Sequence, residues 1–196
     1  MSLLAIEAVR ERFPHAIVET HSNWGDDTIV VRAENWLEIA GFLKSDAHMR
    51  FDMLTDLCGV DYPERETRFE VVVHLYSTSI GHRLRMKTRV GDSDGDGAQI
   101  PTLVNLWPAA NWLERETFDL MGITFTGHPD LRRILTYPEF VGHPLRKDYD
   151  AAFIQPLVSF RTEAEAGLPL GKLAPFDEHE GMSFARKSAG LDAEND

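Results

Sequence analysis

The side chains that could do chemistry in this chain gather around two similar turns between residues 114 and 148. Each turn reads Gly-His-Pro, with His128 in the first and His143 in the second, and arginines and aspartates follow both. Histidines beside carboxylates can ligate a metal ion or work as an acid–base pair. The alternative is structural, because Gly-His-Pro makes a rigid turn and ionisable groups often form ion-pair networks. Two histidines fifteen residues apart on irregular backbone favour the structural interpretation.

Together with the charged end of the preceding helical segment, these turns supply the candidates for a partner-binding surface. The candidates are Glu114, Arg115, Glu116, Asp119, His128, Asp130, Arg132, Arg133, His143, Arg146, Lys147 and Asp148. Their mixed charges can form hydrogen-bonded pairs across an interface. The sequence contains no nucleophile elbow, phosphate-binding loop or zinc helix motif that would favour catalysis instead.

An acidic loop resembles half of a calcium site. Asp92, Asp94 and Asp96, followed by Gly97, match the first half of an EF-hand loop. That motif needs a bidentate glutamate at its twelfth position, where this chain has Leu103. A solvated loop is therefore predicted.

Four cations alternate along one predicted strand, at Arg83, Arg85, Lys87 and Arg89. They form either a docking surface for an anionic partner or a solvated face paired with Glu70. Exposed pairs contribute little to stability, and the solvated face is the favoured interpretation.

Composition excludes several classes of protein. The single cysteine, Cys58, rules out an intrachain disulfide, a four-cysteine zinc site and a cysteine-ligated iron–sulfur cluster. Cys58 lies in an apolar run and is predicted to be buried and inert, and Trp107 and Trp112 are predicted to lie in the core. A net charge of −12 argues against nucleic-acid binding. The first ten residues do not read as a signal peptide, and no apolar run approaches the roughly 18 residues of a membrane span.

Hydrophobic periodicity predicts the elements that must position these side chains. Alternation at residues 69–76 and 84–88 places Val71, Val73, Leu75, Leu84 and Met86 on one buried face. The predicted helices are residues 2–13, 35–44 and 108–121, and the predicted strands are 16–21, 28–33, 51–60, 69–76 and 83–89. The order α-β-β-α-β-β-β predicts an α/β (α+β) fold of two layers, with a mostly antiparallel sheet of about five strands and helices on one face.

The chain divides into three predicted parts. Residues 1–122 form the α/β domain, which ends after the third helix at Gly122. Residues 123–160 form an extended arm punctuated by proline and glycine, and residues 161–196 form a polar, acidic tail that needs another surface to become ordered.

Two runs within this region resemble a known family. The segments 112–123 (WLERETFDLMGI) and 125–135 (FTGHPDLRRIL) are similar to the signature of the 30-kDa subunit of respiratory complex I. In bacteria this family supplies the C subunit of the proton-translocating NADH–quinone oxidoreductase. Further similar segments are 60–63, 69–72, 74–75, 83–88 and 142–149. Together the matches span roughly residues 51–150.

The resemblance implies a peripheral protein on the cytoplasmic side of the inner membrane, attached to the membrane only through its complex. It implies that this chain holds no cofactor, because FMN, the iron–sulfur clusters and quinone belong to other subunits. The implied partners are the 49-kDa-like D subunit and also the B and I subunits, with the arm and tail lying over the D subunit. Two alternatives remain open. One is the equivalent subunit of a membrane-bound hydrogenase or F420H2 dehydrogenase, and the other is a stand-alone metal-dependent enzyme using His128 and His143.

Overall fold

The computed structural model describes residues 2–156, so the predicted tail and the last part of the predicted arm lie outside the described residues. The helices are α1 (Ser2–Arg12), α2 (Trp36–Ser45) and α3 (Ala110–Met121), with a short 3-10 turn at Ala33–Asn35. The strands are β1 (Ile17–Asn23), β2 (Asp26–Val31), β3 (Met53–Asp61), β4 (Phe69–Tyr76), β5 (Arg83–Val90), β6 (Gln99–Pro101) and β7 (Thr124–Thr126).

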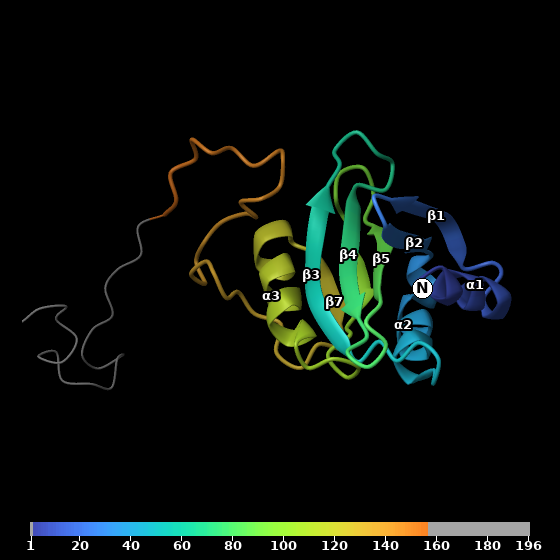
Figure 1. The fold of residues 1–196 in the computed structure, drawn as a ribbon. Helices are drawn as coiled ribbons and strands as arrows, with labels where there is room; N and C mark the ends of the chain where they lie inside the picture. The colour runs from blue at the N-terminus through green and yellow to red at the C-terminus, as the bar shows by residue number, and fades with distance from the viewer. Residues whose placement is uncertain (1, 157–196) are drawn as a thin grey trace, which may run out of the picture. The chain divides into compact units, whose positions relative to one another are not determined.

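Five strands form one sheet in the order β1-β2-β5-β4-β3. All neighbours are antiparallel except β2 and β5, which run parallel. Helices α1 and α2 lie near β1 and β2, whereas α3 lies alongside β3, as Figure 1 shows. The predicted fold class and element order are confirmed. The sequence did not predict the small parallel pair β6 and β7 that precedes and follows α3.

The first hairpin shows how local chemistry sets the register of the sheet. Asn23 pairs with Asp26, so only Trp24 and Gly25 form the turn. Both have positive φ, at 58° and 88°. This is the backbone of a two-residue hairpin turn that matches the twist of its strands. Trp24 is a non-glycine residue in this conformation, and its side chain is fully exposed.

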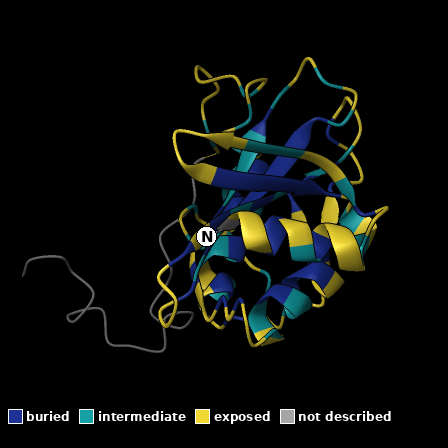
Figure 2. Cartoon of the chain, turned by 45° about the vertical axis from the view of Figure 1, so that its right-hand side comes forward, coloured by how far each residue is buried: buried dark blue, intermediate teal, exposed yellow. Residues whose placement is uncertain are grey.

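The core lies on the face of the sheet that the alternation predicted. Val71, Val73, Leu75, Leu84 and Met86 are all buried, which confirms that prediction. Strands β2 and β4 are mostly buried, whereas β1 has no buried residue. Figure 2 shows dark blue segments in the centre of the sheet and yellow outer faces on the helices. Burial of these aliphatic side chains is the main favourable contribution to folding.

Helix α3 ends as predicted and begins later than predicted. Gly122 has a left-handed backbone with φ 79°, and its N–H donates to the carbonyl of Phe118. The first helical residue is Ala110, because Pro108 belongs to the preceding turn, in which the Ala110 N–H donates to the carbonyl of Trp107. The proline therefore lies before the helix instead of opening it.

Trp107, which precedes α3, and Trp112, in the first turn of α3, have different environments. Trp107 is buried and its indole N–H donates to the carbonyl of Phe51 at 3.0 Å. Trp112 is 65% exposed, so its predicted place in the core is wrong. Its ring instead lies beneath the Arg115 guanidinium, 5.4 Å away, on the outward face of the helix.

Cys58 is only half-buried, and burial together with Asp56 and Glu116 raises the pKa of its thiol.

The other charged features agree with the simpler interpretations of the sequence. Glu70 is buried and pairs with Lys87 at 2.8 Å, with Arg65 at 3.4 Å and with Arg89 at 3.8 Å. The predicted pairing of the basic face with Glu70 is thus present.

In the acidic loop, a carboxylate oxygen of Asp92 accepts the backbone N–H of Asp96 at 2.8 Å. That carboxylate therefore holds the turn together.

Gly59 of β3 lies against Thr117 and Met121 of α3 and against Ile123, which follows the helix. A Cβ added there would lie 3.0 Å from Ile123 Cδ1 and from Thr117 Cγ2. We expect Gly59→Ala to lower the free energy of unfolding by about 1–3 kcal/mol, because the helix must move away from the strand. Urea denaturation measures the change.

Gly41 in α2 provides the matched control for this substitution, since nothing lies within 4 Å of its added Cβ. Gly41→Ala is expected to stabilise the protein by about 0.5–1 kcal/mol through helix propensity. Equal stability of Gly59→Ala and wild type would show that α3 and β3 are not in rigid contact.

Candidate partner interface

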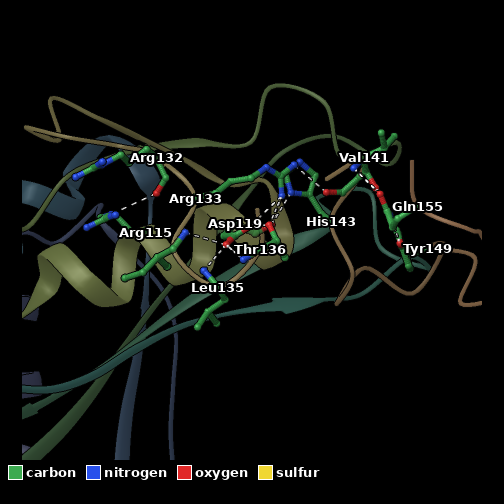
Figure 3. Close-up of polar contacts among 12 residues, drawn as sticks. Arg115, Asp119, Arg132, Arg133, Leu135, Thr136, Val141, His143, Tyr149 and Gln155 are labelled. Carbon is green, nitrogen blue, oxygen red and sulfur yellow. Dashed lines mark hydrogen bonds and ion pairs between the residues drawn. The ribbon is translucent and has the colours of Figure 1, made fainter. Parts of the chain in front are cut away.

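Asp119, in the last turn of α3, anchors the first half of the arm. Its carboxylate is completely buried and accepts the backbone N–H groups of Ile134, Leu135 and Thr136 at 3.0, 2.7 and 2.8 Å. The Thr136 hydroxyl donates to it at 2.5 Å, and Arg133 forms an ion pair with it at 2.8 Å. Figure 3 shows these groups converging on the carboxylate from one loop.

The environment of Asp119 strongly favours its charged form. Burial opposes ionisation, but the hydrogen bonds from the Thr136 hydroxyl and from the three N–H groups outweigh it. They hold the pKa of Asp119 well below its usual range. A carboxylate that accepts several backbone N–H groups behaves in this way. The segment 134–136 is thereby tied to the helix by a charge that persists at neutral pH.

The second Gly-His-Pro turn caps the C-terminus of the same helix. His143 Nδ1 lies 2.9 Å from the carbonyl oxygen of Asp119, and Arg146 Nε donates to the carbonyl of Met121 at 2.7 Å. A carbonyl can only accept, so Nδ1 carries the proton. Burial lowers the pKa of His143, which favours this neutral imidazole. Both side chains lie against Gly122, where a Cβ would come within 2.7 Å of them.

Arg68 fastens the later part of the arm to the sheet. It is buried and bonds both oxygens of Asp61, at 2.7 and 2.9 Å, and also Asp148 at 2.9 Å. Asp61 in addition accepts the backbone N–H of Lys147 at 2.7 Å. The bond from Arg68 is the main cause that lowers the pKa of Asp61. The arm up to Pro156 belongs to the same compact unit as the sheet.

Glu114 is buried in α3, where its contacts are with uncharged groups. Its carboxylate accepts the Thr102 hydroxyl at 2.5 Å and the backbone N–H of Leu103 at 2.7 Å. Burial dominates over these two bonds and raises the pKa of Glu114 to about 7. Glu114 therefore fixes the turn before α3, and its protonation state changes near neutral pH.

The two histidines are not brought together. His128 Nε2 lies 3.2 Å from the carbonyl of Asn111, while His143 contacts Asp119. These two helical positions are eight residues apart, about 12 Å along the axis. Side chains that share a metal ion lie within about 2 Å of it. Within residues 2–156, no group of three histidine, cysteine or acidic side chains could hold a metal ion.

The predicted interface residues thus divide into two groups. Glu114 and Asp119 have no exposed surface and bind their own chain, so they position the arm instead of facing a partner. His128, Arg133, His143 and Arg146 are partly buried against the helix, as is Arg115. Exposed members of the set are Glu116, Asp130, Arg132, Lys147 and Asp148. For the exposed group, contact with a partner stays a prediction.

Sequence reasoning missed a set of exposed apolar side chains on the arm. We call them the apolar arm surface: Leu135, Tyr137, Val141, Leu145, Phe153 and Ile154. Each exposes between 38% and 88% of its surface, and exposed apolar side chains that lie together are typical of interaction sites. The only sequence signal was their presence in a segment without helical or strand periodicity.

The fold and the anchored arm define a class of protein: a two-layer α+β domain that ends in an ordered arm with an apolar surface. Residues 29–153 match the family described as respiratory-chain NADH dehydrogenase, 30 Kd subunit, and the chain belongs to this family. The resemblance drawn from the signature residues is confirmed. In the part of the chain that the structure describes, no helix is long and apolar enough to cross a membrane.

Several curated relatives carry one name, which describes them as the C subunit of NADH-quinone oxidoreductase. The protein from Hyphomonas neptunium is 45% identical over 141 residues, which cover 72% of this chain and 68% of the relative. The protein from Roseiflexus sp. is 48% identical over 143 residues, covering 73% and 80%. A relative from Bdellovibrio bacteriovorus, named as the C/D subunit, is 46% identical over 140 residues, which cover 71% of this chain and 23% of that longer protein.

Two solved structures share the fold. A trypsin-resistant fragment (1–134) of Nqo5 is 34% identical with a TM-score of 0.55, covering 65% of this chain and 99% of the fragment. A chain of the membrane-bound sulfane sulfur reductase, an archaeal respiratory membrane complex, is 28% identical with a TM-score of 0.64. That match covers 77% of this chain and 86% of the other.

Proposed function

We propose that this chain is a non-catalytic subunit of the peripheral arm of a proton-translocating NADH–quinone oxidoreductase and that it docks on the 49-kDa-like D subunit. The observation that carries the proposal is the apolar arm surface, which is held to the domain by Asp119 and Arg68. An arm that is already ordered loses little conformational entropy on binding. The longer relative named as the C/D subunit supports the D subunit as the partner.

In this proposal the redox chemistry belongs to other subunits, which hold FMN, the iron–sulfur clusters and quinone. The single cysteine supports the assignment of the iron–sulfur clusters to other subunits, because such clusters are usually held by four cysteine thiolates. The chain is then a peripheral protein at the cytoplasmic side of the inner membrane, where it also contacts the B and I subunits. It supports electron transfer from NADH to quinone by stabilising the assembly.

Arg132→Ala tests the proposed interface. The side chain is 72% exposed and its ion pair is with its neighbour Asp130, so its removal leaves the domain intact. If Arg132 pairs with a charge buried in the complex, its loss costs about 2–5 kcal/mol, which is at least about a tenfold loss of affinity for the D subunit. Co-purification of the full chain with the co-expressed D subunit measures this loss. Arg146 is a less selective choice, since it also bonds Met121.

Arg10→Ala is the matched control for this test. Arg10 is an exposed arginine whose side chain bonds Thr20. It belongs to α1, which lies at the opposite end of the sheet from α3 in Figure 1. This variant is expected to co-purify at the wild-type yield. Failure of the wild-type chain to retain the D subunit would refute the proposal.

A second candidate is the equivalent subunit of a related membrane complex, favoured by the likeness to the sulfane sulfur reductase chain. The relatives from Hyphomonas and Roseiflexus are more similar in sequence, at 45% and 48% identity. Identification of all proteins that co-purify with the native chain separates the two candidates. NADH-binding subunits support the first, and a nickel-binding or sulfur-reducing partner supports the second.

A further inference from the structure

A groove of about 340 Å³ lies on the arm, next to the apolar arm surface. Its walls include the apolar and aromatic side chains of Val141, Tyr149 and Phe153. The charged residues that line it are Arg146, Asp148 and Asp150. Val141 and Phe153 also belong to the apolar arm surface, so the groove is continuous with the proposed interface. Its volume is at the lower end of the roughly 300–1,000 Å³ typical of ligand pockets, which suits a side chain.

The walls of this groove are held in place without an occupant. The Gln155 side chain accepts the backbone N–H of Val141 at 2.9 Å and donates to its carbonyl at 3.0 Å. The same amide donates to the Tyr149 hydroxyl at 2.7 Å, as Figure 3 shows. Tyr149 also stacks on Phe140, with ring centroids 6.2 Å apart. One amide thus fixes two walls that lie eight residues apart in the sequence, and such preorganisation favours binding.

A turn at Asp150 brings the remaining wall into position. The Asp150 carboxylate accepts the N–H of Ala152 at 2.8 Å, and its backbone carbonyl accepts the N–H of Phe153 at 3.0 Å. This Asx-type turn is a local feature of aspartate. Phe153 remains about half exposed, although it lines the groove.

Arg146 has hydrogen-bonding capacity left at the edge of the groove. Its Nε donates to Met121, and its guanidinium lies over the Phe69 ring at 5.0 Å. Within residues 2–156 it forms no ion pair, whereas Arg132 and Arg133 each pair with an aspartate. Nη2 lies against Gly122, and the Arg146 charge helps to lower the pKa values of Asp61 and Asp148. The hydrogen-bonding capacity that remains suits a carboxylate, the acceptor that arginine matches best.

We propose that this groove receives one aliphatic or aromatic side chain of the D subunit, next to a carboxylate of that protein that accepts hydrogen bonds from Arg146. This inference rests on the proposed function and names the anchor point of that interface. An apolar side chain in a preformed pocket beside an arginine has the composition of an interface hot spot. The walls supply the apolar contact, and Arg146 fixes the orientation of the incoming segment.

The test compares two exposed apolar residues in the full chain. Phe153→Ala removes a wall of the groove, while Val18→Ala removes a similarly exposed apolar side chain from β1, which belongs neither to the groove nor to the apolar arm surface. We expect at least about a tenfold loss of affinity for the D subunit in the first variant and less than about a threefold loss in the second. Gln155→Ala should lower the affinity in the same direction, because Val141 and Tyr149 lose their common partner.

A photo-crosslinker identifies the occupant directly. With p-benzoylphenylalanine in place of Phe153, we expect a crosslink to an apolar residue of the D subunit, within a few residues of an aspartate or glutamate. A crosslink to residues 157–196 of this chain, or to a second copy of it, would overturn the inference. So would unchanged affinity of Phe153→Ala, and that result would leave the docking on the D subunit intact. If the wild-type chain itself did not bind the D subunit, both proposals would be overturned.

Discussion

Replacement of Asp119 by alanine is expected to detach the arm from α3 and to lower the free energy of unfolding by about 3–5 kcal/mol. The substitution removes the acceptor for three backbone N–H groups and for the Thr136 hydroxyl. It also leaves Arg133 without its carboxylate. Breaking a buried ion pair from one side has a cost of this size, because the remaining groups stay desolvated.

Two measurements distinguish this outcome from general instability. Urea denaturation gives the free energy, and hydrogen exchange reports whether the amides of residues 134–136 lose their protection. Asp130→Ala is the control, since its pair with Arg132 is exposed and is worth less than about 1 kcal/mol. Retained protection at residues 134–136 in Asp119→Ala would show that the carboxylate does not anchor the arm.

The same carboxylate predicts how the arm responds to acid. The pKa of Asp119 is lower in the folded protein than its ordinary value of 3.8. Its contribution to stability is therefore complete above about pH 4 and is lost as the pH falls through the folded-state pKa. We expect the amides of residues 134–136 to lose protection in acid in the wild-type chain.

Glu114→Gln is expected to change the free energy of unfolding more favourably at pH 8 than at pH 4.5. The difference between its effects at the two pH values is expected to be about 3 kcal/mol. The pKa of Glu114 rises from its ordinary value of 4.5 to about 7 in the folded protein. Between these two values the folded protein keeps a proton that the unfolded chain has lost, so stability falls as the pH rises through this window. Each unit of pKa corresponds to about 1.4 kcal/mol.

Glutamine can preserve both contacts without the charge. Its amide oxygen can accept the Leu103 N–H and its amide nitrogen can donate to the Thr102 hydroxyl, as a protonated carboxyl group would. Urea denaturation of both proteins across pH 4.5–8 measures the difference, in which the contributions of other groups cancel. Glu116→Gln provides the control, because that side chain is exposed and should follow the wild-type profile. If the free energies of unfolding of Glu114→Gln and wild type differed by the same amount at every pH, the pKa of Glu114 would not be raised by burial in the folded protein.

These two carboxylates explain why the arm is ordered although it has few regular elements. Glu114 secures the turn before α3, and Asp119 secures the loop after it. Helix α3 is in turn packed on β3 through Gly59. Helix α3 therefore connects the arm to the sheet. The apolar arm surface is held in a fixed position on the domain.

The sequence alone determined the features that repeat locally. Alternation placed Val71 and Leu84 on the core face, and Gly122 ended α3 where a left-handed residue was required. The signature around Trp112 to Leu135 was sufficient for the family, because it is a long contiguous run. Strand and helix periods are local geometry, so a single chain reports them directly.

The tertiary structure decided everything that depends on residues distant in sequence. Arg68 and Asp148 are eighty residues apart, and no spacing rule links them before the arm folds back on the sheet. The exposure of Trp112 and the burial of Asp119 likewise follow from how α3 is oriented between β3 and the arm. Charge and hydrophobicity state what a side chain prefers, whereas its partners are set by the packing of the whole domain. The sequence could therefore identify the charged residues of the arm, while the fold determined which of them bind their own chain and which remain for a partner.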